Sequence, residues 1–149
     1  MKIKAKNMKI YFQKIDPSAK LPSYAYEGDA GMDLFSCHDV EIKPDKREII
    51  STGLKVAVPN GHAGFVWDKS GISIKNHVTT LAGVIDSNYR GELHVALTNL
   101  GRKIYKVKKG EKIAQLVIKP VLQAEIIEVE KIEENKIRGE RGFGSSGLV

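Results

Sequence analysis

Short stretches rich in valine and isoleucine alternate with polar turns along most of the chain. From Val40 onward these stretches have the length of β-strands, and Pro, Asn, Asp and Gly residues separate them. Their β-branched composition and even spacing favour a sandwich or jelly roll. The predicted strands are VEIK (40–43), EIISTGLKVAV (48–58), GFVW (64–67), LHVALTN (93–99), KIYKV (103–107), KIAQLVIKPV (112–121) and AEIIEVEKI (124–132).

Helical periodicity is weak throughout the sequence. Only SGISIKN (70–76) and the segment around Tyr24 are predicted as helical turns, and neither carries a sustained apolar stripe. A parallel sheet built from βαβ units is therefore not expected. We predict an all-β, jelly-roll-like β-clip or barrel subunit with one short helix. The 149 residues are expected to form a single domain, with 1–7 as a possible N-terminal extension.

The amino-acid composition indicates the charge of the partner and the cellular compartment. The formal net charge of +6 favours an anionic ligand, although charge alone does not separate a nucleotide from a nucleic acid. Cys37 is the only cysteine, which excludes an intrachain disulfide and favours a reducing cytoplasm. No apolar run is long enough for a signal peptide or a bilayer span, so we expect no membrane association.

The stretch RGERGFGSSG (138–147) combines glycine, arginine and serine with one aromatic residue, Phe143. It cannot pack a core by itself, because glycine loses much backbone entropy on ordering. Arginine and serine suit phosphate oxygens, and Phe143 offers a ring on which a base can stack. Two interpretations stay open here: a disordered tail with weak RNA affinity, or an arm that orders around a nucleotide. We predict a linker and mobile C-terminal arm over 130–149.

Hydrolysis of a phosphate ester or anhydride needs a carboxylate to polarise water, together with cations and hydrogen-bond donors for the phosphates. GVIDSNYRGELHVALTN (83–99) is predicted to be a β-hairpin with Asp86 and Tyr89 at its mouth. An aspartate in a turn more commonly caps backbone amides. Both roles therefore remain open for Asp86 on this pattern alone.

Three further stretches carry candidate polar groups. DKSGIS (68–73) places Lys69 before a helical turn whose free amides suit phosphate. Asp33 in AGMDLFS (30–36) lies among apolar residues and needs a partner, either a lysine or arginine or a water molecule on bound Mg²⁺. Gln115 in KGEKIAQLVI (109–118) is an amide in an apolar strand and also needs hydrogen-bond partners.

In this order, the stretches resemble the five motifs of the trimeric dUTPases, which hydrolyse deoxyuridine triphosphate. The resemblance spans nearly the whole chain, from the lead-in DPSAKLPSYAYEGDAG (16–31) to the C-terminal stretch. It implies a jelly-roll-like subunit in a homotrimer, with each active site built from three chains and closed by the arm. It also implies dUTP as the substrate, Mg²⁺ as the cofactor and no stable binding of nucleic acid.

The resemblance assigns roles residue by residue. Asp86 would hold the water that attacks the α-phosphorus, and Tyr89 would pack beneath the deoxyribose and exclude a 2′-hydroxyl. Main-chain groups from Thr80 to Gly83 would read uracil, while Asp33 would hold Mg²⁺ through water. The remaining predicted substrate contacts are Lys69, Ser70, Gly71 and Gln115 around the phosphates, and Arg138, Phe143, Gly144, Ser145 and Ser146 in the arm.

The sequence also departs from the family pattern. Asp68-Lys69 stands where the family usually has Pro-Arg, and Arg141 replaces a usual glycine. Lysine keeps the charge but loses the bidentate fork of arginine, and the adjacent Asp68 could compete with phosphate for it. Glu111-Lys112 for Asp-Arg and Ser146 for Thr are milder changes.

Other functions were weighed against this one. A dCTP deaminase would need a glutamate where this chain has Ala96, and a catalytically weak nucleotide-binding relative would have no need of Asp86 and Tyr89 together. A nucleic-acid binder would be expected to carry several exposed aromatic residues among cations. The histidines and Cys37 lack the spacing of metal ligands.

Overall fold

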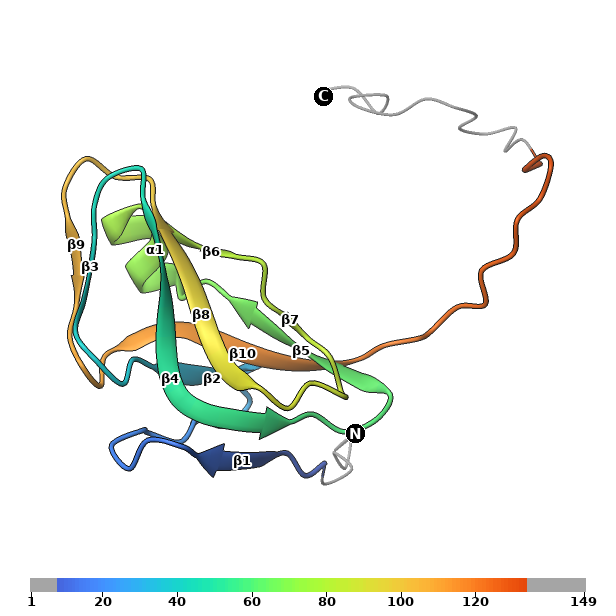
Figure 1. The fold of residues 1–149 in the computed structure, drawn as a ribbon, viewed down its shortest axis with the longest axis horizontal. Coiled ribbons are helices and arrows are strands. Elements are labelled where there is room, and N and C mark those ends of the chain that lie inside the picture. The colour runs from blue at the N-terminus through green and yellow to red at the C-terminus, as the bar shows by residue number, and fades with distance from the viewer. Residues whose placement is uncertain (1–7, 134–149) are drawn as a thin grey trace.

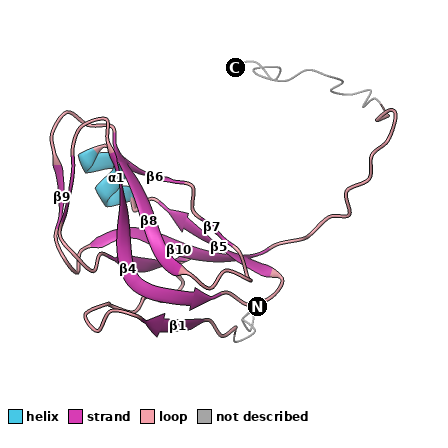
Figure 2. Ribbon diagram, viewed as in Figure 1, coloured by secondary structure: helices cyan, strands magenta, loops and turns pink. Residues whose placement is uncertain are grey.

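The computed structural model describes residues 8–133, in which antiparallel strands and one helix form the fold (Figures 1 and 2). Two four-stranded sheets have the orders β1-β4-β8-β6 and β2-β10-β5-β7, and β3 pairs with β9. The strands are β1 (Tyr11–Lys14), β2 (Gly31–Phe35), β3 (Val40–Ile42), β4 (Arg47–Ala57), β5 (His62–Trp67), β6 (Val78–Leu81), β7 (Val84–Ile85), β8 (Glu92–Asn99), β9 (Tyr105–Val107) and β10 (Lys112–Pro120), and the helix is α1 (Ser70–Asn76).

The all-β prediction is confirmed, and so is the helix at 70–76. Six predicted stretches coincide with β3, β4, β5, β8, β9 and β10. Every strand pair in the described residues is antiparallel, as expected for a chain without βαβ units. Within residues 8–133 the sheets remain open and do not close into a barrel.

The core lies between the two four-stranded sheets and follows the alternation of the strands. In β8, Leu93, Val95 and Leu97 are buried, while His94 and Ala96 point to the other side. The inward residues of β8 join Leu34 of β2 and Leu116 of β10 in one apolar cluster. Burial of this cluster stabilises the packing of the sheets.

Strand β4 bends at Gly53, where it changes partners. Residues 47–51 pair with β8 alone, whereas residues 54–57 pair with β1, and Lys55 among them still pairs with β8 after a register shift. Gly53 has φ of 68°, and a Cβ there would lie 2.9 Å from the side chains of Ala19 and Asp16. Glycine is needed at this bulge for both reasons, and the bend is visible in Figure 1.

Helix α1 ends at His77, which adopts a left-handed conformation with φ of 54°. The helix has no buried residue, and no helix in the described range is long and apolar enough to cross a membrane. The predicted helical turn near Tyr24 is wrong. There the Asp29 carboxylate accepts the Tyr26 N–H at 2.9 Å, and Ser23 forms an isolated bridge with Asp33, so the segment is a turn beside β2.

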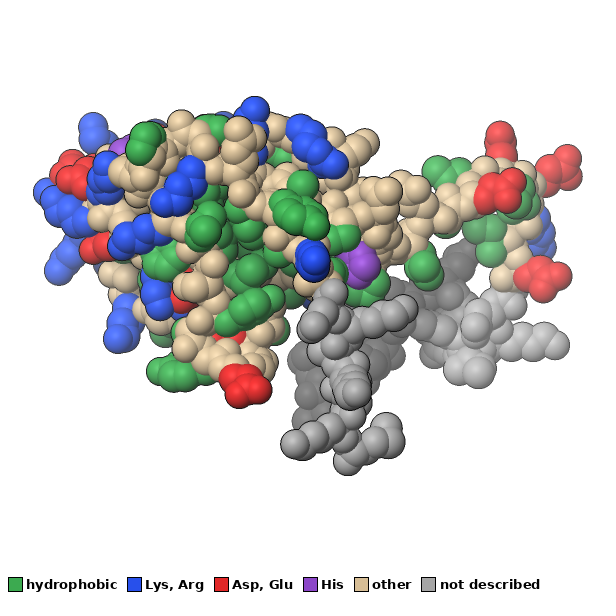
Figure 3. All heavy atoms as spheres, turned by 90° about the horizontal axis from the view of Figure 1, so that it is seen from below, with side chains coloured by type: hydrophobic (Ala, Val, Ile, Leu, Met, Phe, Trp, Pro, Cys, Tyr) green, Lys and Arg blue, Asp and Glu red, His purple; other side chains and the backbone are tan. Residues whose placement is uncertain are grey.

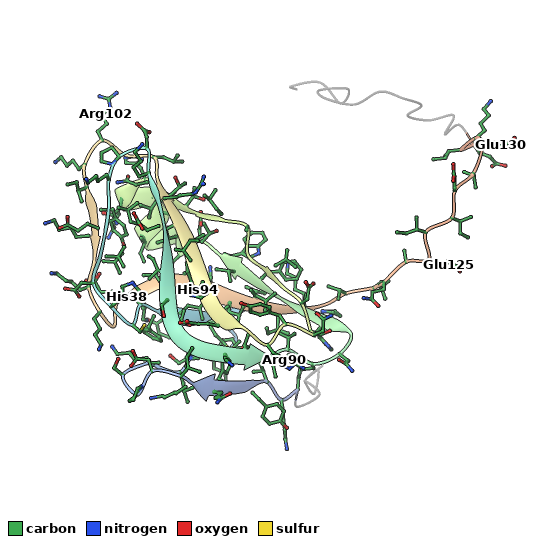
Figure 4. The ribbon with its side chains drawn as sticks, viewed as in Figure 1. His38, Arg90, His94, Arg102, Glu125 and Glu130 are labelled. Carbon is green, nitrogen blue, oxygen red and sulfur yellow. The ribbon has the colours of Figure 1, made fainter. Side chains whose placement is uncertain are left out.

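The predicted strand at 124–132 is also wrong. Figure 1 shows the chain leaving the sheets after β10, and Figure 4 places Glu125 and Glu130 along this extended segment. Ile126 and Ile132 are 96% and 82% exposed. A strand needs a hydrogen-bonded neighbour, and no described strand pairs with these residues. The segment therefore has the composition of a β-strand, but no described strand pairs with it.

The predicted hairpin at 83–99 is wrong in its pairing. β7 pairs with β5, through Gly64 opposite Ile85, whereas β8 pairs with β4 and β6. A Cβ on Gly64 would lie 3.3 Å from Cβ of Ile85, so the absence of a side chain there leaves room for β7. The strand-turn-strand pattern therefore connects two sheets instead of forming a hairpin.

Candidate active site

A cavity of about 260 Å³ lies beside Asp86 and Tyr89. Its walls come from the chain at Ala82 and Gly83, from the turn after β7, and from the outward side of β8 with Ala96. In Figure 4, His94 marks β8 and Arg90 marks the end of the turn. Three predicted residues of one stretch, Gly83, Asp86 and Tyr89, therefore line the same cavity.

The turn from Asp86 to Tyr89 is held by several hydrogen bonds. The Tyr89 N–H donates to the Asp86 carbonyl at 3.1 Å, and the Tyr89 hydroxyl donates to the Glu92 carbonyl at 2.8 Å. Arg90 Nη1 donates to the Ser87 and Tyr89 carbonyls, each at 2.7 Å. A Cβ on Gly91 would overlap the Tyr89 hydroxyl. The tyrosine ring is therefore fixed by its hydroxyl and by the small residue behind it.

Asp86 itself is exposed at this turn. No donor in residues 8–133 forms a hydrogen bond with its side-chain carboxylate, although its carbonyl closes the turn. An exposed carboxylate without a protein donor can accept hydrogen bonds from water. This is the property that a residue polarising an attacking water requires.

The chain between β6 and β7 forms a strained corner. Ala82 has φ of 59° and Gly83 has φ of 111°. A Cβ on Gly83 would lie 2.7 Å from the Val66 carbonyl oxygen, so the position needs glycine. The Val66 N–H donates to the Gly83 carbonyl at 2.8 Å, while the Thr80 N–H donates to Asp68 Oδ1 at 2.6 Å. Of the main-chain groups from Thr80 to Gly83 that were predicted to read uracil, the Thr80 N–H is therefore already bound within the protein.

A second group of predicted residues lies around Asp33 of β2, which is only 3% exposed. Lys69 Nζ lies 2.6 Å from Asp33 Oδ1, and Lys112 Nζ lies 2.6 Å from Oδ2. Burial raises the pKa of Asp33, but the bonds from Lys112 and Lys69 outweigh burial and hold that pKa below its ordinary value of 3.8. Of the two partners considered for Asp33, the structure supplies lysine.

Asp68 connects helix α1 to its surroundings. Its carboxylate accepts the Thr79 hydroxyl at 2.7 Å and the Ser73 hydroxyl at 3.3 Å, and its carbonyl accepts the Gln115 amide at 2.9 Å. In the described residues Lys69 pairs with Asp33 and forms no ion pair with the adjacent Asp68. The start of α1, at Ser70 and Gly71, is exposed.

The structure thus arranges the predicted residues in two groups. Asp86, Tyr89 and Gly83 line the cavity, whereas Asp33, Lys69 and Gln115 lie at β2, β10 and the start of α1 together with Ser70 and Gly71. Within the described part of the chain, no hydrogen bond or ion pair joins Asp86 or Tyr89 to the second group. Arg138, Phe143, Gly144, Ser145 and Ser146 lie outside the described residues.

The described residues do not form a metal cage. Across 8–133, no three or more His, Cys, Asp or Glu side chains are grouped to hold a metal ion. Each oxygen of Asp33 faces a lysine and the side chain is only 4% exposed, so little room is left for a metal-bound water to reach this carboxylate. The described side chains therefore do not fit a metal ion that the protein holds directly. They fit a metal ion that a bound phosphate compound holds.

Sequence reasoning did not assign three residues that the structure places at these sites. Asp68 and Lys112 were noted only as departures from a family pattern, and Glu92 was not considered. Glu92 lines the cavity and accepts the Gly53 N–H at 2.9 Å, while His94 lies 3.4 Å from its other oxygen. The only sequence feature that could have drawn attention to Asp68 is its position next to the predicted phosphate-binding turn. Its hydrogen-bond partners come from other segments, so the sequence does not reveal them.

Comparison with known proteins supplies independent evidence. A family model described as dUTPase matches residues 17–147. A deoxyuridine 5'-triphosphate nucleotidohydrolase from Clostridium kluyveri is 46% identical over 144 residues, covering 95% of this chain and 100% of that protein. The corresponding protein from Clostridium novyi is 44% identical, with coverage of 95% and 100%.

Solved structures agree with these relatives. The dUTPase of Staphylococcus bacteriophage 80alpha with dUPNHPP has a TM-score of 0.89 and 31% identity, covering 94% of this chain and 99% of that chain. A mutant dUTPase from phage phi11 of S. aureus, in which a structural Mg(II) ion is coordinated, has a TM-score of 0.79 and 27% identity, with coverage of 83% and 98%. By family model, relatives and structure alike, the chain belongs to the dUTPase family.

Proposed function

We propose that this chain hydrolyses dUTP to dUMP and pyrophosphate. The observation that carries the proposal is the single cavity lined by Asp86, Tyr89 and Gly83, which the sequence predicted to serve one nucleotide. Membership of the dUTPase family supports the same reaction. The reaction would limit uracil incorporation into DNA and supply dUMP for synthesis of dTMP.

In the proposed reaction, Asp86 holds and polarises the attacking water and accepts its proton as the water oxygen bonds to the α-phosphorus. The bond from the α-phosphorus to the bridging oxygen breaks, and pyrophosphate leaves. The exposed Asp86 carboxylate can accept this water directly. Its place at the end of a hydrogen-bonded turn limits its movement relative to Tyr89.

Sugar and base selection come from the cavity walls. The Tyr89 ring, fixed by its hydroxyl bond to Glu92, packs beneath the deoxyribose and clashes with a 2′-hydroxyl. Main-chain groups at the corner formed by Ala82 and Gly83 read the uracil edge, whereas Thr80, also predicted to contact the base, is not among the residues that line the cavity. Because the Thr80 N–H is bound to Asp68, the groups nearer Gly83 remain for the base.

The triphosphate is the proposed ligand of the second group. Lys69 supplies positive charge, Ser70 and Gly71 supply exposed amides, and Gln115 reaches the α-phosphate region. In the arm, Arg138 binds the terminal phosphate, Phe143 stacks on uracil, and the segment 144–146 adds amide and hydroxyl donors. Closure of the arm would expel water from the reacting phosphates.

A homotrimer with shared active sites is the proposed assembly. The predicted phosphate-binding residues of the described chain do not line the cavity beside Asp86, and a neighbouring chain could bring such residues to each cavity. Apolar side chains also reach the surface, as Figure 3 shows for one face. Beside the cavity, Ile49 is 67% exposed and Val84 is 62% exposed. Burial of such residues favours association.

Mg²⁺ is the proposed cofactor, bound mainly by the triphosphate because the described residues do not form a cage for it. When bound, it neutralises part of the phosphate charge. Contact between Asp33 and a metal-bound water remains part of this proposal. A reducing cytoplasm is the proposed compartment, since Cys37 cannot form an intrachain disulfide.

Pyrophosphate release with Mg²⁺ from dUTP, UTP, dCTP and dTTP tests the function, with chromatography to detect any deaminated product. We expect rapid release from dUTP alone. Asp86→Asn should lower kcat by at least about a hundredfold while leaving binding of a non-hydrolysable dUTP analogue intact, because only water activation is lost.

No pyrophosphate release from any of the four nucleotides would instead favour a catalytically weak nucleotide-binding relative. Deamination of dCTP would favour the deaminase, although Ala96 offers only a methyl group to the cavity. An Asp86→Asn variant with unchanged turnover would exclude the assigned role of this residue.

A further inference from the structure

We propose that Asp68 is a positioning residue that fixes the base-reading wall of the cavity, an inference that rests on the proposed hydrolysis of dUTP. Asp68 lies between β5 and α1. It accepts four hydrogen bonds from three elements: from Thr80 and Thr79 of β6, from Ser73 of α1 and from Gln115 of β10. No base-reading role had been assigned to this residue from the sequence.

The shortest of these bonds lies close to the strained corner. Thr80 N–H donates to Asp68 Oδ1 at 2.6 Å, and Leu81, Ala82 and Gly83, which follow Thr80, line the cavity. Ala82 has φ of 59° without being glycine, a conformation that persists only when its surroundings hold it. The corner therefore depends on anchors to either side of Ala82.

Besides the pairing of β6 with β8, two anchors come from the end of β5 and the residue that follows it. Val66 N–H donates to the Gly83 carbonyl at 2.8 Å on one side, and the Asp68 carboxylate binds Thr80 N–H on the other. Val66 and Asp68 are two residues apart, so one short segment holds the corner at two points. Without the Asp68 bond, only the pairing of β6 with β8 would hold the side of the corner that precedes Ala82.

The charge of Asp68 strengthens this anchor. Burial raises the pKa of Asp68, but the hydrogen bonds from Thr80, Thr79 and Ser73 outweigh burial and hold the pKa below its ordinary value of 3.8. An ionised carboxylate accepts stronger hydrogen bonds than a neutral oxygen. Because the neighbouring Lys69 pairs with Asp33, the charge of Asp68 remains directed at β6.

The departure from the family pattern explains why such an anchor is needed. A proline at this position would restrict the backbone entering α1 through its fixed φ. Asp68 has no ring, and its hydrogen bonds to β6, α1 and β10 restrain the same junction instead. Discrimination by main-chain groups requires those groups to stay in place, so loss of the anchor should weaken the choice of uracil over cytosine.

The test compares Asp68→Ala with Asp68→Asn, measuring kcat and KM for dUTP and for dCTP together with Tm. We expect Asp68→Ala to lower the ratio of kcat/KM for dUTP over dCTP by about tenfold, mainly through a higher KM for dUTP. Asp68→Asn should retain most of the ratio, because its amide oxygen can still accept from Thr80 N–H. Ser73→Ala is the matched control, since it removes only the 3.3 Å bond from the same carboxylate.

The inference is overturned if Asp68→Ala lowers Tm but leaves both the KM for dUTP and the discrimination unchanged, as a purely structural residue would. If Asp68→Ala does not fold, Asp68→Glu replaces it: the charge is kept, the acceptor moves by one methylene, and a smaller loss of discrimination is expected. Wild-type protein that fails to hydrolyse dUTP would contradict the proposed function itself, and the Asp68 comparison is made only against active wild-type protein.

Discussion

Among single residues, Asp33 shows how much one buried carboxylate determines at this site. Its oxygens bind Lys69 and Lys112, each at 2.6 Å, and its side chain is only 4% exposed. Asp33→Asn would remove the negative charge that lies between Lys69 and Lys112, so the two positive charges would repel each other without compensation. We expect the free energy of unfolding, measured in urea, to fall by about 2 kcal/mol. Glu41→Gln, in an exposed pair with Lys106, is the control and should cause no measurable change.

The pH dependence of this effect follows from the lowered pKa of Asp33. A carboxyl group whose pKa is lower in the folded protein stabilises the fold above its unfolded pKa, and this stabilisation is lost as pH falls through the folded value. The difference in unfolding free energy between wild type and Asp33→Asn should therefore be constant above about pH 5 and shrink below 3.8. A difference that persisted unchanged to the acid limit would show that charge is not its cause.

At the scale of elements, the corner between β6 and β7 connects two sheets and forms a cavity wall. Gly83→Ala would place a Cβ 2.7 Å from the Val66 carbonyl at a φ of 111°. We expect a loss of about 1–3 kcal/mol in unfolding free energy and a higher KM for dUTP. Gly71→Ala is the stability control, because its Cβ would meet no atom within 4 Å and alanine favours a helix. Equal stability of the two variants would contradict the strain at Gly83.

The elements also show what local sequence can and cannot predict. β8 and α1 were predictable because their β-branched residues and turn signals act locally. The pairing of β7 with β5, and the lack of a partner for 124–132, depend on distant segments. The same distinction holds at the site: Asp86, Tyr89 and Gly83 belong to one recognisable stretch, whereas the partners of Asp68 come from β6, α1 and β10.

At the scale of the whole molecule, the cavity beside Asp86 is not lined by the predicted phosphate-binding residues of the described chain, and this observation leads to the proposal of shared sites. Asp33 is paired with Lys69, and neither of these residues nor the start of α1 lines the cavity beside Asp86. An enzyme with this arrangement would be inactive as a monomer. We therefore expect activity only in the assembled trimer. The mass of this trimer should be three times that of the 16.5 kDa chain.

Complementation between two inactive variants tests this arrangement. The Asp86→Asn chain keeps its arm, and a chain ending at Glu133 keeps Asp86; each alone should be nearly inactive. If Asp86 and the arm of one site come from different chains, random mixing by joint refolding leaves about a quarter of the sites with both intact parts, and activity returns to that level. If both come from the same chain, no site is complete in any mixture, and the absence of recovery in trimers confirmed by sedimentation would exclude sites in which one chain supplies Asp86 and another supplies the arm.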